Sequence, residues 1–117
     1  MGDRGQILIE DTGVYLYTFY DAAKLDEILR VALIKGSDRW NDPEYLSRII
    51  FQTMIGDDKS NIGYGIGTKT YRDVRRMLKV DCKKQKVLEH ESGKKYAHVK
   101  SFTDFISVKP KIQKVEK

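Results

Sequence analysis

Two short runs of apolar residues near the start of the chain have the pattern of β-strands. Residues 6–9 and 14–19 are rich in β-branched and aromatic side chains, and a four-residue segment ending in Gly13 separates them. Glycine readily takes the positive φ that hairpin loops need. The pattern therefore predicts an N-terminal β-hairpin.

The spacing of apolar residues then changes to that of an amphipathic helix. Across residues 22–35 they recur at i, i+3, i+4 and i+7, which places them on one helix face. We expect Asp21 to cap this helix and Gly36 to end it in the left-handed conformation. The residues predicted to face inward are Leu25, Ile28, Leu29 and Ala32.

A second helix is predicted over residues 43–55. Asp42 is placed to cap this helix, and Pro43 suits its first turn. Residues 37–41 alone connect the two helices, so the chain must turn sharply, and we expect Trp40 to fill the space between helix ends and sheet. The residues predicted to face inward are Leu46, Ile49, Ile50 and Met54.

The second half of the chain has the pattern of short strands joined by turns. Strand-like stretches occupy residues 62–68, 77–82, 86–91 and 96–100. The sequence Ser-Phe-Thr-Asp that follows them resembles a capping box, which predicts a short helix over residues 102–107.

Together these elements predict an α+β fold. We expect a mainly antiparallel sheet of about five strands with an N-terminal β-hairpin, two consecutive helices packed on it and a short C-terminal helix. No internal repeat or linker is visible, so residues 1–108 are predicted to form a single domain. Residues 109–117 are predicted to be a basic, frayed tail.

The composition is that of a globular protein, but the charge is unevenly distributed. Of 117 residues, 40% are hydrophobic and 33% are charged, with a formal net charge of +5. Residues 1–68 hold 7 basic and 11 acidic residues, whereas residues 69–117 hold 15 and 6, so the halves carry about −4 and +9. This split favours an acidic partner, although lysines also keep exposed strands soluble. The candidate nucleic-acid contacts are Arg72, Arg75, Arg76, Lys83, Lys84 and Lys86, with Tyr71 and Tyr96 available for stacking.

Several function classes find no support in the sequence. No apolar stretch approaches the roughly 20 residues of a membrane helix, and the N-terminus lacks the apolar region of a secretory signal, so we expect a cytoplasmic protein without membrane contact. Cys82 is the lone cysteine, and His90 and His98 do not stand at ligand spacing, so no metal or cofactor is predicted. No nucleophile elbow or paired-carboxylate motif marks a catalytic residue. A binding protein is therefore favoured over an enzyme.

The segment 63–70 resembles a phosphate-binding loop, because glycines permit close approach and Lys69 can reach an anion. Its spacing differs from that of a Walker loop, since Thr68 rather than a glycine precedes the lysine. Alternating glycines in a strand also allow a ring such as Trp40 to pack closely, or they mark a bulge. Tyr64, Thr68 and Lys69 are candidate ligand contacts under the first interpretation.

The connection between the two helices provides a second set of candidates. Arg39 and Trp40 supply a guanidinium and an indole, which can clamp an anionic ligand that has a ring, such as a nucleotide. The same indole is also typical of a small hydrophobic core. Arg48 is the third candidate, although an ion pair with Glu44 one turn earlier explains it without a ligand.

Six segments of the chain resemble an uncharacterised family of small proteins of bacteria and their phages. These segments are YLYTFY, LDEILRVAL, DRWNDPEYLSRIIFQTMI, GYGIGT, VDCKKQKV and SFTDFI. The resemblance spans most of the chain, and DRWNDPEYLSRIIF is its most distinctive part. It implies an intracellular, phage-related setting and no particular activity. Phe19 and Tyr20 stand where the family pattern is expected to have a His-Trp pair, so no role for a histidine is carried over.

The leading hypothesis from the sequence is a non-enzymatic binding protein, phage-encoded, that holds a small anionic ligand such as a nucleotide signal or modulates a host protein. The ligand contacts predicted for it are Arg39, Trp40, Arg48, Tyr64, Thr68 and Lys69. The alternatives are a nucleic-acid-binding protein that uses the basic C-terminal half, and a small hydrolase. A homo-oligomer is also expected, because the tyrosine-rich second strand offers a face for pairing.

Overall fold

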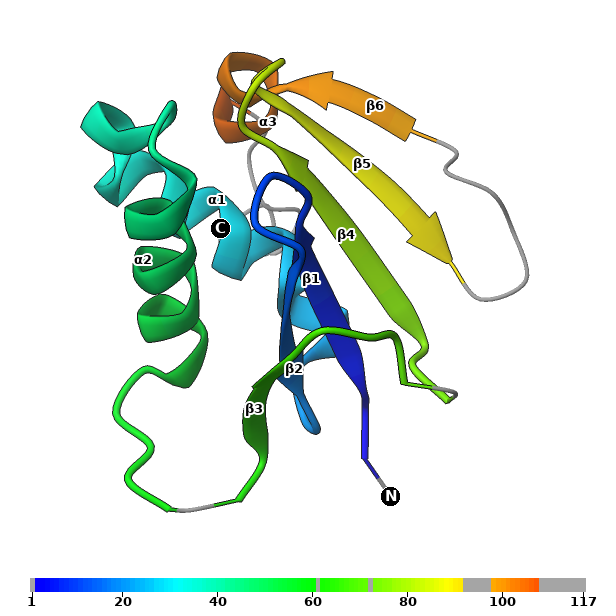
Figure 1. The fold of residues 1–117 in the computed structure, drawn as a ribbon. Helices are drawn as coiled ribbons and strands as arrows, with labels where there is room; N and C mark the ends of the chain where they lie inside the picture. The colour runs from blue at the N-terminus through cyan, green and yellow to red at the C-terminus, as the bar shows by residue number, and fades with distance from the viewer. Residues whose placement is uncertain (1, 61, 72, 92–97, 108–117) are drawn as a thin grey trace, which may run out of the picture.

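The computed structural model describes residues 2–60, 62–71, 73–91 and 98–107, and they form a six-stranded mixed sheet with helices on one face (Figure 1). The strand order across the sheet is β3-β2-β1-β4-β5-β6. The predicted α+β class is therefore confirmed. The strands are β1 (Gly5–Ile9), β2 (Val14–Thr18), β3 (Tyr64–Gly67), β4 (Arg76–Asp81), β5 (Lys86–Glu91) and β6 (His98–Ser101).

The strand directions differ in part from the prediction. β1 and β2 form the expected N-terminal hairpin, with Gly13 in its loop at a φ of 75°. However, the sheet has six strands instead of about five, and β1 pairs with β4 in parallel. The reason is that the chain crosses the sheet after β3, so that β4 enters beside β1 in the same direction. Apolar alternation locates a strand but does not encode its direction.

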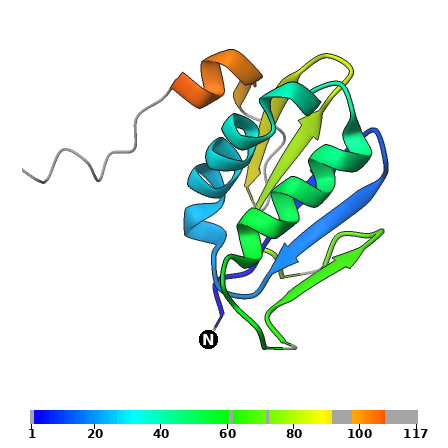
Figure 2. The same ribbon diagram turned by 90° about the vertical axis from the view of Figure 1, so that its left-hand side faces the viewer.

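Two consecutive helices cover one face of the sheet, as predicted (Figure 2). The first begins with a 3-10 turn, η1 (Ala22–Lys24), and continues as α1 (Leu25–Lys35). A second 3-10 turn, η2 (Ser37–Arg39), connects it to α2 (Pro43–Ile55). The predicted inward residues are confirmed: Leu25, Leu29, Ala32, Leu46, Ile50 and Met54 are buried, and Ile28 and Ile49 pack against them.

The helix ends differ in detail from the predicted caps. Neither Asp21 nor Asp42 makes a side-chain capping hydrogen bond, although both occupy the expected positions. Gly36 has a φ of −100°, so it is not left-handed. A glycine suits this position for a different reason, because a Cβ would stand 3.1 Å from side-chain carbons of Leu46 and Ile49 in α2, a tight contact. The close approach of the two helices therefore explains Gly36.

The short helix α3 (Phe102–Ser107) follows β6 directly, as predicted. Ser101 accepts a hydrogen bond from the backbone N–H of Asp104 at 3.1 Å, which confirms the expected cap. Phe102 is buried and its ring meets the ring of Trp40 edge to face, with centroids 5.3 Å apart. The predicted tail over residues 109–117 lies outside the described residues.

Candidate ligand-binding surface

The second face of the sheet carries a different set of side chains from the helix-covered face. Leu16 of β2 points into the core, so its neighbours Tyr15 and Tyr17 point to the opposite face. In the pairing of β2 with β3, Tyr15 stands opposite Gly67 and Tyr17 opposite Gly65. In the described part of the chain, no helix covers this face, which we call the open face (Figure 1).

The segment between β3 and β4 crosses the open face in front of β2 and β1 (Figure 1). Gln6 of β1 fixes it there, because its side-chain amide donates to the Lys69 carbonyl at 3.1 Å and accepts from the Tyr71 backbone N–H at 3.1 Å. Gln6 is only 1% exposed, and both ends of its amide are satisfied. The crossing segment is therefore held in place by a buried polar side chain.

Two tyrosine rings meet where the segment crosses β2. The rings of Tyr17 and Tyr71 are edge to face with centroids 4.8 Å apart, and Tyr71 remains 46% exposed. Thr68 and Lys69 are also exposed, and Lys69 has no acidic partner among the described residues. A cation thus lies in the same segment as an exposed aromatic ring. We call this region the crossover surface: Gln6, Tyr15, Tyr17, Thr68, Lys69 and Tyr71.

The glycines of β3 have no packing role in the described structure. No atom beyond their chain neighbours lies within 4 Å of the position that a Cβ would take at Gly65 or Gly67. The strand pairs with β2 without interruption from Tyr64 to Gly67. The structure therefore shows neither of the expected structural reasons for these glycines, a bulge or close packing by the Trp40 ring.

Tyr64 faces the helix side of the sheet and does not belong to the crossover surface. Its hydroxyl donates to Asp21 Oδ2 at 3.0 Å, and the Thr18 hydroxyl also lies 3.3 Å from this oxygen. Burial, together with the Asp21 carboxylate, raises the pKa of Tyr64 to about 12. The phenol therefore stays protonated and ties β3 to the turn that precedes α1.

Arg39 lies in η2, just before α2, and Arg48 lies near the middle of α2. The Arg39 guanidinium lies 4.7 Å from the centre of the exposed Tyr45 ring and 3.5 Å from the Asp42 carboxylate. Arg48 donates to the Gln52 side chain at 2.6 Å instead of pairing with Glu44 as expected. Both arginines therefore have intramolecular partners at an exposed helix surface.

Trp40 packs against the hydrophobic core, which is the alternative to ligand binding that its residue type suggested. Its indole N–H donates to the Leu33 carbonyl at 2.9 Å, and its ring packs against the core. The indole thus joins the end of α1 to α3, at the point where the chain turns between the helices. Its N–H and part of its ring are therefore engaged within the protein.

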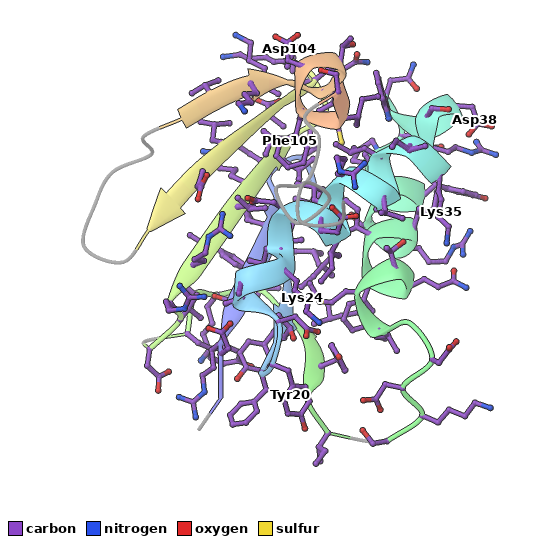
Figure 3. The ribbon with its side chains drawn as sticks, turned by 180° about the vertical axis from the view of Figure 1, so that it is seen from behind. Tyr20, Lys24, Lys35, Asp38, Asp104 and Phe105 are labelled. Atoms are coloured by element: carbon purple, nitrogen blue, oxygen red, sulfur yellow. The ribbon has the colours of Figure 1, made fainter. Side chains whose placement is uncertain are left out.

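The structure does not bring the six predicted ligand contacts together. Arg39 and Trp40 lie just before α2 and Arg48 lies near its middle, whereas Tyr64 is in β3, after the end of α2, and Thr68 and Lys69 follow β3. A helix of 13 residues is about 20 Å long. Figure 3 shows this separation: Asp38, next to Arg39, lies at the opposite end from Tyr20, whose ring packs on Gly63.

Several of the predicted nucleic-acid contacts are engaged within the protein. Arg76 is 9% exposed and its guanidinium lies 2.8 Å from Asp26 of α1 and 2.5 Å from Glu89 of β5. Burial opposes its charge, but these two carboxylates outweigh burial and raise the pKa of Arg76 above its ordinary value. Arg76 is therefore enclosed and does not reach the surface.

The remaining candidates are divided between two places. Arg75 makes two hydrogen bonds with Asp3, at 2.7 and 3.2 Å, and so lowers the pKa of that carboxyl. Lys83 and Lys84, in the turn between β4 and β5, and Lys86, the first residue of β5, are exposed. Arg72 and Tyr96 lie outside the described residues.

Cys82 has the properties of a structural residue. It is buried just after β4, and its backbone N–H donates to Asp11 at 2.7 Å. Burial, with the nearby Asp11 carboxylate, raises the pKa of the thiol to about 12, so almost no thiolate forms near neutral pH. Across the described residues, no three or more His, Cys, Asp or Glu side chains gather in a way that would hold a metal ion.

No protein-family model matches this chain, and neither the curated proteins nor the solved structures include one with significant similarity to it. Among the described helices, none is long and apolar enough to cross a membrane.

Proposed function

We propose that this chain is a non-enzymatic binding protein that holds a small anionic ligand with a planar ring, such as a nucleotide, on the crossover surface. One observation carries the proposal: the buried Gln6 side chain fixes a segment that presents exposed Lys69 and Tyr71 beside Tyr17. The Gln6 side chain holds this segment in place, although the pairing of the strands does not require the segment to lie there.

The residue types of the crossover surface suit such a ligand. Tyrosine rings contact planar rings through their apolar faces, and a lysine without an acidic partner attracts an anionic group. Gly65 and Gly67 of β3 have no side chains beside Tyr15 and Tyr17, so a ligand can approach the β3 backbone closely there. Thr68 adds a hydroxyl that can donate or accept a hydrogen bond. The contacts proposed here include Thr68 and Lys69 from the sequence prediction and add Tyr15, Tyr17 and Tyr71.

The arrangement supports a small ligand better than a long nucleic acid. A nucleic-acid interface needs several cations that are free to contact successive phosphates. Here Arg76 is enclosed, Arg75 is paired with Asp3, and Lys79 of the open face lies 3.1 Å from Glu10. The exposed lysines at 83, 84 and 86 belong to the turn after β4 and to the start of β5, and not to the crossover surface.

Calorimetric titration with mononucleotides and cyclic nucleotides tests the proposal. For the nucleotide that binds best, Tyr71→Ala and Lys69→Ala are each expected to raise the Kd about tenfold or more, since one stacking contact contributes about 1–3 kcal/mol. Lys35→Ala at the end of α1 is the matched control, and Arg39→Ala tests the rival surface at the start of α2. Neither of these two is expected to change the Kd. The proposal is wrong if no nucleotide binds more tightly than millimolar, or if Arg39→Ala weakens binding and Tyr71→Ala does not.

A further inference from the structure

β3 forms one edge of the sheet and has none of the features that keep an edge strand from pairing. Its sequence, Tyr-Gly-Ile-Gly, contains no charged residue and no proline, and its pairing with β2 has no bulge. In Figure 2 no helix or strand is drawn in front of it. The opposite edge, β6, has an exposed lysine, Lys100, in its four residues.

The hydrogen bonds to β2 show which backbone groups of β3 face outward. Phe19 N–H donates to the Gly63 carbonyl at 2.8 Å, so Gly63 and Phe19 stand at a hydrogen-bonding position of the ladder. Such positions alternate along an antiparallel ladder, so Gly65 and Gly67 also bond to β2. The N–H and C=O groups of Tyr64 and Ile66 consequently point away from the sheet, toward its free edge.

Apolar side chains are exposed along the same edge. Ile66 is 61% exposed and Ile62, two residues before β3, is 64% exposed. These are the two most exposed of the large hydrophobic residues in the described part of the chain. Unpaired backbone groups beside exposed isoleucines are the features that favour the addition of another strand.

We propose that β3 pairs antiparallel with β3 of a second copy of this chain, about a two-fold axis at Ile66, so that two sheets join into one. A second copy is the occupant that the strand fits best, because the pairing is self-complementary. The outward-facing backbone groups of Ile66 meet those of the partner's Ile66, and those of Tyr64 face the partner's Thr68, the residue that follows β3. Each copy also buries its exposed Ile66 side chain against the partner's Ile66.

The charges near the edge are compatible with this pairing. With Ile66 at the two-fold axis, Tyr64 stands opposite the partner's Thr68, and Gly65 opposite the partner's Gly67. Lys69 stands opposite the partner's Gly63, so no like charges meet across the new ladder. A two-fold axis perpendicular to the sheet also places both crossover surfaces on the same face of the joined sheet. The pairing itself does not depend on what those surfaces bind.

The first test is the mass of the full chain in solution by sedimentation velocity and light scattering. We expect twice the monomer mass of 13.6 kDa for the unchanged chain. Ile66→Lys places two positive charges at the two-fold axis and is expected to give the monomer mass. Val99→Lys makes the same kind of change at an exposed residue of β6 and should leave the dimer intact. A monomeric unchanged chain, or an Ile66→Lys variant that stays dimeric, would overturn the proposal.

A cross-linking test examines the register even if the lysine variant does not fold. The Cα atoms of a hydrogen-bonded antiparallel pair are about 5.5 Å apart, within the range of about 4.4–6.8 Å that a disulfide spans. Ile66→Cys is therefore expected to form a covalent dimer on mild oxidation, because native Cys82 is buried. Thr68→Cys is the control: the two copies of residue 68 would lie about 13 Å apart along the ladder. Equal cross-linking of the two variants would contradict the proposed axis.

Discussion

Replacing Arg76 with alanine is expected to lower the free energy of unfolding by about 3 kcal/mol, an effect typical of breaking a buried ion pair. The Arg76 side chain is 9% exposed and contacts carboxylates from two different elements, Asp26 of α1 and Glu89 of β5. Its NH1 also lies 3.4 Å from the Ala22 carbonyl. Removal of the guanidinium leaves the half-buried Glu89 carboxylate without its cation and leaves a cavity beneath the start of α1.

Chemical denaturation followed by circular dichroism measures this effect. Arg75→Ala is the matched control, because Arg75 is the adjacent residue but its ion pair with Asp3 is exposed, and exposed pairs contribute only about 0–1 kcal/mol. Arg76→Met keeps part of the buried volume, so we expect it to be less destabilised than Arg76→Ala. If Arg76→Ala were no less stable than Arg75→Ala, the charge network would not hold α1 on the sheet.

Replacing Trp40 with alanine is expected to lower the free energy of unfolding by about 3 kcal/mol. The ring packs edge to face on Phe102 and its N–H donates to the Leu33 carbonyl, so the substitution removes contacts with α1 and α3 together. Trp40→Phe retains a ring but loses the donor, which leaves the Leu33 carbonyl short of a partner. For this variant we expect a loss of about 1 kcal/mol.

Thermal and chemical denaturation monitored by circular dichroism compare the two Trp40 variants with the unchanged chain. Tyr45→Ala is the control, since Tyr45 is exposed at the same end of α2 and touches Arg39 instead of the core. A Trp40→Ala variant as stable as Tyr45→Ala would show that the indole does not contribute to the core.

The helical part of the fold was predictable from local sequence, whereas the sheet was predictable only in outline. The spacing of Leu25, Leu29 and Leu46 defines the buried helix faces without any long-range information. The parallel pairing of β1 with β4 depends on where the chain crosses the sheet, and that path is fixed by Gln6, 65 residues before the N–H of Tyr71 that it binds. No local pattern in either segment encodes such a contact.

The candidate surface was predictable to a smaller extent. Lys69 and Thr68 were predicted as ligand contacts because they follow a glycine-rich stretch. The same prediction placed them in one site with Arg39 and Trp40, which α2 separates from them. Gln6 could have been noticed as a polar residue in a buried apolar strand, since such residues are retained only with satisfied hydrogen bonds. The roles of Trp40 and Arg76 could not be predicted from the sequence, because their residue types suit both ligand binding and internal contacts. Only the packing shows that both make internal contacts.

The most direct test of the central claim, that the crossover surface is the binding site, is an amide NMR titration of the full chain with the nucleotide that binds best. The proposal predicts that the largest chemical-shift changes fall on Gly65–Tyr71 and on Tyr15 and Tyr17 of β2, with little change at the start of α2. Changes concentrated instead on Arg39, Tyr45 and Arg48, or on the lysines at 83, 84 and 86, would contradict it.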